Sequence, residues 1–375
     1  MPQEHDVSRQ LDGLQQCLSQ NRRPLGLLLA AGCGLSIKHP DDPKKPLIRD
    51  VAGLTEDLVV CLKGSPNAAV HKSVVEHLIE DGLANPNIEA ILSHVRAMSR
   101  IAGKKDLHGH NRASIDKLET AICEFIAKAV DQALPEKGTA YHHLGRWLRS
   151  QRRQDPIEIF TTNYDLLIEQ GLESHKAPYF DGFIGNRRPF LDIAAIEQDQ
   201  LPARWTRVWK LHGSINWQFE KDAGVIRRIG GSAGGAALIH PSHLKYEQSR
   251  RMPYLIMIDR LRSFLRKPSA VLVVCGYSFG DDHINECLVE GLRSNPSAVV
   301  FGLLFDKLDN YQQSHDFTNT ATNLKLLARD GAIVGARKAL WKKADDGTSL
   351  EFTHGDFAAF GELLSELAGT ETNGV

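Results

Sequence analysis

The sequence has little cysteine, and its cysteines are not clustered. Six are scattered over 375 residues, with no C-x-x-C pair and no short Cys/His group. They are Cys17, Cys33, Cys61, Cys123, Cys275 and Cys287. This spacing argues against a disulfide framework and against a zinc ribbon. We therefore expect no zinc and no other bound metal.

Long apolar runs and an excess of one charge are also lacking. No apolar run reaches the roughly 18 residues that a membrane span requires, and residues 1–6 lack the basic-then-apolar layout of a signal peptide. We therefore expect a cytoplasmic protein with no membrane contact. The net charge is −1, so no direct nucleic-acid binding is expected. Basic stretches at 146–153 and 250–267 are typical of solvated helix faces, with docking of an acidic partner as the alternative.

An apolar run that stops at polar residues is the central feature of the chain. Residues 157–160 predict a buried strand of a parallel sheet, entered from a loop that contains Pro156. Asn163 and Asp165 follow the carboxyl end of this strand, which is the edge where open α/β sheets bind ligands. The alternative is that Asn163 caps a helix starting at Tyr164.

The remaining periodicity predicts an α/β fold, a parallel sheet flanked by helices and carrying a helical insertion. Further strands are expected at 25–30, 206–211, 270–275 and 298–304, with short strands within 181–186 and at 237–241. Residues 38–50, rich in Pro, Lys and Asp, predict a loop, and the glycine-rich stretch at 230–235 has little to bury. We expect a core of residues 1–52 and 136–305, a helical insertion at 53–135 and a C-terminal α/β extension at 306–375.

Two other strand ends repeat the pattern. His212 follows the strand at 206–211 and could share a crevice with Asn163, where its imidazole could accept a proton near neutral pH. A structural histidine inside the sheet is the alternative. Gly32 and Gly34 follow the first strand, where small residues let backbone N–H groups approach a phosphate, although any tight turn uses similar glycines. Asp281 is expected to cap the helix after the strand at 270–275.

Four segments together resemble the silent-information-regulator superfamily, the sirtuins and their relatives. Residues 32–36 resemble its G-A-G-x-S loop, and residues 162–165 its T-x-N-x-D motif. Residues 211–214 match L-H-G-S, and residues 276–281 match the G-Y-S-x-x-D of the bacterial sirtuin-like branch. Each motif is short, but the four occur in the family's order.

The resemblance implies a Rossmann-like sheet that binds nicotinamide adenine dinucleotide (NAD+). Asn163 and His212 would be catalytic: Asn163 would orient water and the ribose hydroxyls, and His212 would accept a proton. Asp165 would hold the nicotinamide carboxamide, and Ser278 would meet the adenosine ribose or the phosphates. The residues implied in binding are Ala31, Gly32, Cys33, Gly34, Ser36, Thr162, Asp165, Gly276, Tyr277 and Ser278.

Two departures from the family narrow the expected activity. No cysteine lies between His212 and Cys275, so the zinc module of the deacetylases is missing. Residues 46–50 stand in place of the usual G-I-P-D-F-R. The pattern resembles bacterial antiphage proteins that destroy NAD+, some of which form multimers with a HerA-like hexameric ATPase. It implies a homo-oligomeric NAD+ hydrolase that releases nicotinamide and ADP-ribose; the alternatives are an NAD-dependent protein deacylase and a non-catalytic NAD-binding scaffold for an ATPase.

Overall fold

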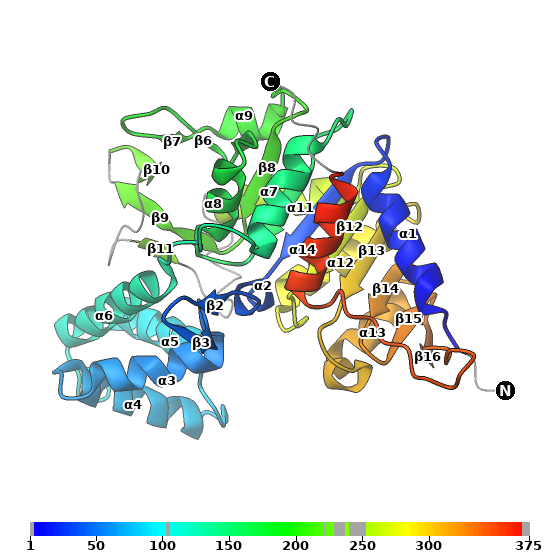
Figure 1. Ribbon diagram of the computed structural model, residues 1–375. Helices are drawn as coiled ribbons and strands as arrows, with labels where there is room; N and C mark the ends of the chain where they lie inside the picture. Colours follow the sequence, from blue (N-terminus) through cyan, green and yellow to red (C-terminus); the bar gives the residue numbers. More distant parts are fainter. Residues whose placement is uncertain (1–3, 103–105, 221, 229–236, 240–252, 370–375) are drawn as a thin grey trace.

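A nine-stranded sheet forms the centre of the protein, as the computed structural model shows (Figure 1). The structure describes residues 4–102, 106–220, 222–228, 237–239 and 253–369. The strand order is β16-β15-β14-β13-β12-β1-β4-β8-β5. The strands are β1 (Leu25–Leu29), β4 (Glu158–Thr161), β5 (Tyr179–Phe180), β8 (Thr206–Lys210), β12 (Val271–Cys275), β13 (Val299–Leu303), β14 (Leu324–Leu327), β15 (Gly331–Val334) and β16 (Arg337–Leu340). All neighbours from β14 to β5 are parallel, whereas β15 and β16 are antiparallel, so the predicted α/β class is confirmed.

Helices cover both faces of this sheet, and each face buries an apolar core. Leu27 and Leu29 of β1 point into one core, while Leu28 points into the other, as the alternation of a strand requires. The first core is covered by α1 (Val7–Ser19), α7 (Ala140–Ser150), α8 (Leu167–Ser174) and α14 (Phe357–Leu367). The second is covered by α11 (Tyr254–Leu265), α12 (Asp282–Ser294) and α13 (Gln312–Thr320). Every residue of β1 and β12, at the centre of the sheet, is buried, as expected for strands covered by helices on both faces.

The predicted helical insertion consists of four helices that lie beside the sheet, at the lower left of Figure 1. They are α3 (Val51–Leu62), α4 (Asn67–Glu80), α5 (Ile88–Ile101) and α6 (Arg112–Val130). Side chains of Asp50, Asn87 and Asn111 cap the first turns of α3, α5 and α6, which explains where these helices begin.

A second sheet of five strands was not predicted as a unit. Its order is β11-β9-β10-β7-β6, and β9 is its longest strand. The strands are β6 (Phe183–Ile184), β7 (Phe190–Leu191), β9 (Gly213–Glu220), β10 (Gly224–Arg227) and β11 (Ala237–Ile239). Only β6 and β11 correspond to expected short strands. The alternation of Ile215, Trp217 and Phe219 with polar residues was the available signal for β9.

The prediction of a loop over residues 38–50 is wrong in part, because a hairpin of β2 (Lys38–His39) and β3 (Asp42–Pro46) forms there. A two-stranded ribbon leaves one side of each strand unpaired, so Pro43 and Pro46 are tolerated in it. The glycine-rich residues 230–235 lie outside the described residues.

The C-terminal residues continue the main sheet. Strand β14 pairs in parallel with β13, so the sheet runs across the proposed boundary at residue 305. The division of the chain into core, insertion and extension therefore remains a prediction.

Part of the second basic stretch has a structural role. Lys267 Nζ lies 2.7 Å from Oε1 of the buried Glu158, and Arg260 Nη2 lies 3.2 Å from Oε2 of the same carboxylate. These two cations are thus held at the base of the sheet. Arg250 and Arg251 lie outside the described residues.

Candidate functional site

A cavity of about 390 Å³ opens at the carboxyl ends of the central strands. Asn163 and His212 both line it. The other residues expected at the site that also line it are Ala31, Gly34, Thr162, Asp165, Gly276, Tyr277 and Ser278. Residues from the ends of β1, β4, β8 and β12, which are far apart in the sequence, therefore meet around one space.

Backbone hydrogen bonds hold the ends of β4 and β8 together. Leu211 N donates to the Thr161 carbonyl over 2.8 Å, and Ile215 N donates to the Tyr164 carbonyl over 3.1 Å. The two strands are parallel and adjacent, with Thr161 opposite Lys210. Because β4 and β8 end at the same edge of the sheet, the residues just beyond each strand face the same cavity.

The amide of Asn163 is anchored to the neighbouring strand end. Its Nδ2 donates to the Ala30 carbonyl over 3.2 Å, and its backbone N donates to Thr161 Oγ1 over 3.0 Å. The alternative that Asn163 caps a helix starting at Tyr164 is wrong, because α8 begins only at Leu167. The N–H of Leu167 is instead bound by the Asp165 carboxylate over 2.9 Å.

His212 is paired with the carboxylate of Asp281, which lies in the loop after β12. Its Nε2 lies 2.9 Å from Asp281 Oδ2, and both side chains are about nine-tenths buried, with 11% and 8% exposed. The expected capping role of Asp281 is confirmed: its Oδ1 accepts hydrogen bonds from His283 N at 3.0 Å and Ile284 N at 3.2 Å. Sequence reasoning missed the pairing with His212, since no local pattern connects residues of two different loops.

A buried ion cluster supports the floor of the site. Lys210 Nζ donates to the backbone carbonyl of Asp165 and lies 3.2 Å from Glu169 Oε1. Burial raises the pKa of both Asp165 and Glu169, and the Lys210 charge partly opposes the increase. Lys210 thus fixes the backbone just after Asn163.

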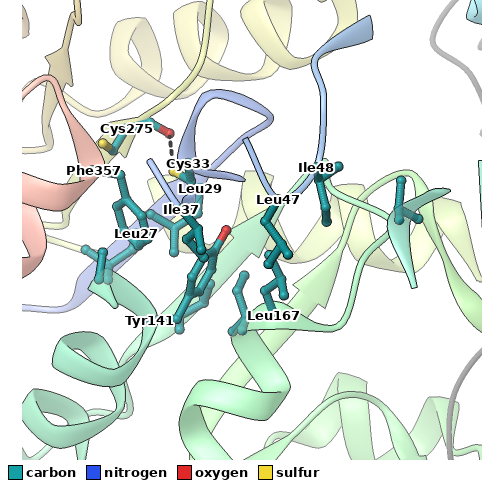
Figure 2. Close-up of a cluster of buried hydrophobic side chains, with 14 of the residues drawn as sticks. Leu27, Leu29, Cys33, Ile37, Leu47, Ile48, Tyr141, Leu167, Cys275 and Phe357 are labelled. Carbon is teal, nitrogen blue, oxygen red and sulfur yellow. Dashed lines mark hydrogen bonds between the residues drawn. The ribbon is translucent and has the colours of Figure 1, made fainter. Parts of the chain in front are cut away.

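Gly32, Cys33 and Ser36, although expected at the site, do not line the cavity. Gly32 N donates to the Gly276 carbonyl over 2.9 Å, and a Cβ on Gly32 would lie 2.8 Å from Gly276 Cα. The Cys33 thiol donates to the Cys275 carbonyl over 3.3 Å (Figure 2). Ser36 Oγ donates to the Cys33 carbonyl over 2.8 Å. Gly32 and Cys33 thus join the end of β1 to the end of β12 behind the cavity wall, and Ser36 stabilises the turn that contains Gly34.

The loop that carries Ser278 has an uncommon backbone. Gly276 has φ 69° and Phe279 has φ 59°, both in the left-handed region. Asn285 Nδ2 donates to the Phe279 carbonyl over 2.7 Å, and Tyr277 Oη bonds to Asn285 Oδ1 over 2.8 Å. Asn285, in α12, therefore holds this loop against the cavity.

The helical insertion supplies part of the cavity wall, which the sequence did not indicate. The lining residues at its base and within it are Ile48, Arg49, Val51, Leu54, Asn87, Glu89 and Val130. Glu89 Oε1 accepts a hydrogen bond from Tyr164 Oη over 3.2 Å, so the insertion contacts the residue next to Asn163. Arg49 is held by Asp57 at 2.6 Å and Glu56 at 2.7 Å.

Neither a group of metal ligands nor a membrane-spanning helix is found in the part of the chain that the structure describes. Among the residues that the structure describes, no three His, Cys, Asp or Glu side chains are grouped so as to hold a metal ion. None of the described helices has both the length and the apolar character needed to cross a membrane.

Part of the chain, including cavity residues that follow β4, β8 and β12, is similar to a known family. No curated protein matches the chain. The chain is similar to a solved structure described as a Sir2 homolog–NAD complex, with 12% identity and a TM-score of 0.34, over 98% of this chain and 94% of the other. Residues 157–321, which include Asn163, His212 and Asp281, match the family model of the SIR2-like domain.

Proposed function

We propose that this protein hydrolyses NAD+ to nicotinamide and ADP-ribose. One observation carries the proposal: Asn163 and His212, an amide and an imidazole from different strand ends, line one cavity of about 390 Å³. Ligand pockets typically have volumes of roughly 300–1,000 Å³. The match of residues 157–321 to the SIR2-like domain supports a dinucleotide as the ligand.

In the proposed reaction the bond between ribose C1′ and the nicotinamide nitrogen breaks. Its electron pair goes to that nitrogen, which loses its positive charge, and C1′ passes through an oxocarbenium-like state. The oxygen of a water molecule then bonds to C1′, and the proton that this water releases goes to His212 and from there to solvent. Base assistance of this kind is typically worth about a hundred- to ten-thousandfold in rate.

The other residues would hold the substrate. Asn163 would orient the attacking water and the ribose hydroxyls through its amide, whose rotation is fixed by Ala30. Asp165 would hold the nicotinamide carboxamide. Ala31, Gly34 and Thr162 would approach the dinucleotide through their place on the wall.

The loop after β12 would bind the other half of the dinucleotide. Gly276 and Tyr277 line the cavity, and Ser278 would meet the adenosine ribose or the phosphates. Gly32, Cys33 and Ser36 would act indirectly, because Gly32 and Cys33 join the ends of β1 and β12 and Ser36 stabilises the turn that contains Gly34.

The proposed cellular role is depletion of NAD+ in the cytoplasm as a defence against phage. This role, a homo-oligomeric state and a HerA-like hexameric ATPase partner rest on the resemblance of the four motifs and the large helical insertion. Cells that carry the protein with and without such an ATPase should differ in NAD+ content after infection.

The decisive experiment follows nicotinamide release from NAD+ by the purified protein, alone and with a HerA-like ATPase. Asn163→Ala and His212→Ala should each lower the rate by at least about a hundredfold. Asn310→Ala and His5→Ala make the same changes away from the cavity and should leave the rate of nicotinamide release unchanged. Release at the wild-type rate by either cavity variant would refute the assigned roles.

The two alternatives predict different results in the same assay. A deacylase would require an acyl-lysine peptide and would form O-acyl-ADP-ribose. A scaffold would bind NAD+ with no turnover, with or without the ATPase.

A further inference from the structure

We infer that Asp281 is a positioning residue for His212, holding the imidazole so that Nδ1 is the nitrogen that accepts the proton. The inference rests on the proposed hydrolysis and assigns a role to a residue that contacts the base and not the reacting atoms. It follows from the contact of 2.9 Å between His212 Nε2 and Asp281 Oδ2.

The chemistry of the pair decides which nitrogen carries the proton. A carboxylate only accepts hydrogen bonds, so the nitrogen facing it must be an N–H donor. A neutral imidazole protonated on Nε2 has its lone pair on Nδ1. When Nδ1 takes a proton from water, the ring becomes a cation, and the adjacent Asp281 carboxylate stabilises that charge.

Asp281 is well placed to hold the ring because its own orientation is fixed. Oδ1 accepts two backbone N–H groups at the start of α12, over 3.0 and 3.2 Å. The Asp281 carbonyl is bonded by Tyr277 Oη over 3.0 Å. The positive end of the α12 dipole also favours the ionised form of the carboxylate. Since Oδ1 caps the helix and Oδ2 contacts His212, the two roles lie on different atoms.

Several other groups face His212 across the cavity. The charged or titratable residues that share the cavity with it are Arg49, Glu89, Tyr164, Asp165, Tyr277 and Asp281. The ring of Tyr164 is 6.5 Å from the imidazole between centroids. Burial raises the pKa of Tyr164 well above its usual range, so its hydroxyl stays neutral. The Asp281 carboxylate lies 2.9 Å from the imidazole, measured from Oδ2 to Nε2.

Asp281→Asn tests the inference, because Asn caps a helix about as well as Asp but carries no charge. In Asp281→Asn kcat should drop at least about tenfold, because the neutral amide no longer selects one tautomer of His212. KM should change less than kcat.

Two further variants separate positioning from capping. Asp281→Ser retains a capping oxygen but loses the second one, so it should show the same loss of kcat with a near-normal melting temperature. Asp356→Asn is the matched control: Asp356 caps α14 by accepting from Ala358 N over 3.0 Å, away from the cavity. Its kcat should equal that of the wild type.

NMR of the His212 ring nitrogens reports the tautomer without any turnover. Protonation on Nε2 in the wild type and a mixture of tautomers in Asp281→Asn, together with the lower kcat, is the expected result. The same tautomer populations in both proteins, or an unchanged kcat in a stably folded Asp281→Asn, would overturn the inference while leaving the hydrolase intact. If the wild type and its ATPase complex release no nicotinamide, the proposed function fails, and the positioning role of Asp281 in it fails too.

Discussion

Gly276 directly follows strand β12 and has a backbone conformation that other residues adopt only with strain. Its φ is 69°, and a Cβ there would lie 2.5 Å from Cys33 N and 2.8 Å from Cys33 Sγ. The close contact joins the ends of β1 and β12, where Gly32 N donates to the Gly276 carbonyl. The absence of a side chain at Gly276 therefore allows the ends of β1 and β12 to approach closely at the cavity.

Gly276→Ala should destabilise the protein strongly. A left-handed conformation alone costs roughly 1–2 kcal/mol for a residue with a Cβ, and the clash with the Cys33 backbone adds to it. Gly224→Ala is the matched control, because Gly224 has φ 71° with no atom within 4 Å of the Cβ position. Denaturant unfolding should show a clearly larger loss for Gly276→Ala; equal losses would contradict a tight junction.

At the scale of single elements, helix α4 of the insertion contains a buried histidine, His71, and helix α5 a half-buried one, His94. His71 is 8% exposed, and burial lowers its pKa. Burial also lowers the pKa of His94, with nearby His77 and His108 acting in the same direction and Asp81 opposing. Nε2 of His71 and of His94 has no hydrogen-bond partner among the described residues. Both rings are therefore packed in their uncharged form.

Acid should weaken the insertion before it weakens the main sheet. In the unfolded chain these histidines take up protons below a pH of about 6.5, whereas the folded chain resists protonation. Stability is therefore fully present above that pH and falls as the pH drops towards the lowered folded values. Hydrogen exchange at pH 7.5 and 5.5 should show a selective loss of protection in α4 and α5. Equal changes in α1, which packs on the main sheet and contains no histidine, would argue against this.

At the scale of the whole molecule, the main sheet connects the core to the C-terminal residues. Strand β14 pairs with β13, and α14 packs on α7. Gly355 lies directly against the end of β13, where a Cβ would fall within 2.3 Å of the Leu304 carbonyl carbon. Residues 306–375 thus cover one side of the core, which is formed by residues that precede them in the sequence.

A chain that ends at residue 305 should not fold on its own. It would expose the edge of β13 and leave the face of α7 that packs on α14 uncovered, and such apolar surface promotes aggregation. Circular dichroism should show no cooperative unfolding for this truncated chain. A cooperative transition with retained NAD+ binding would establish residues 306–375 as a separable domain.

Prediction from sequence succeeded where an apolar run ended at a polar residue. The ends of β4 and β8 identified Asn163 and His212, because a strand buried on both faces leaves its own signal and ligands bind at its carboxyl end. It failed for Asn163 as a helix cap, for the hairpin at 38–46 and for the sheet around β9. The second sheet depends on pairings distant in sequence, such as Ile226 of β10 with Phe190 of β7, whereas the hairpin and the start of α8 are set by local backbone pairing and by the Asp165 side chain.

The sequence by itself determined the α/β class, the four insertion helices and the strand ends that carry polar side chains, because periodicity and end signals are local. Only the tertiary structure decided that the insertion forms a wall of the cavity and that Asp281 contacts His212. Strand order and helix packing set those distances, and both arise from burial of apolar surface across the whole chain, which no short motif encodes.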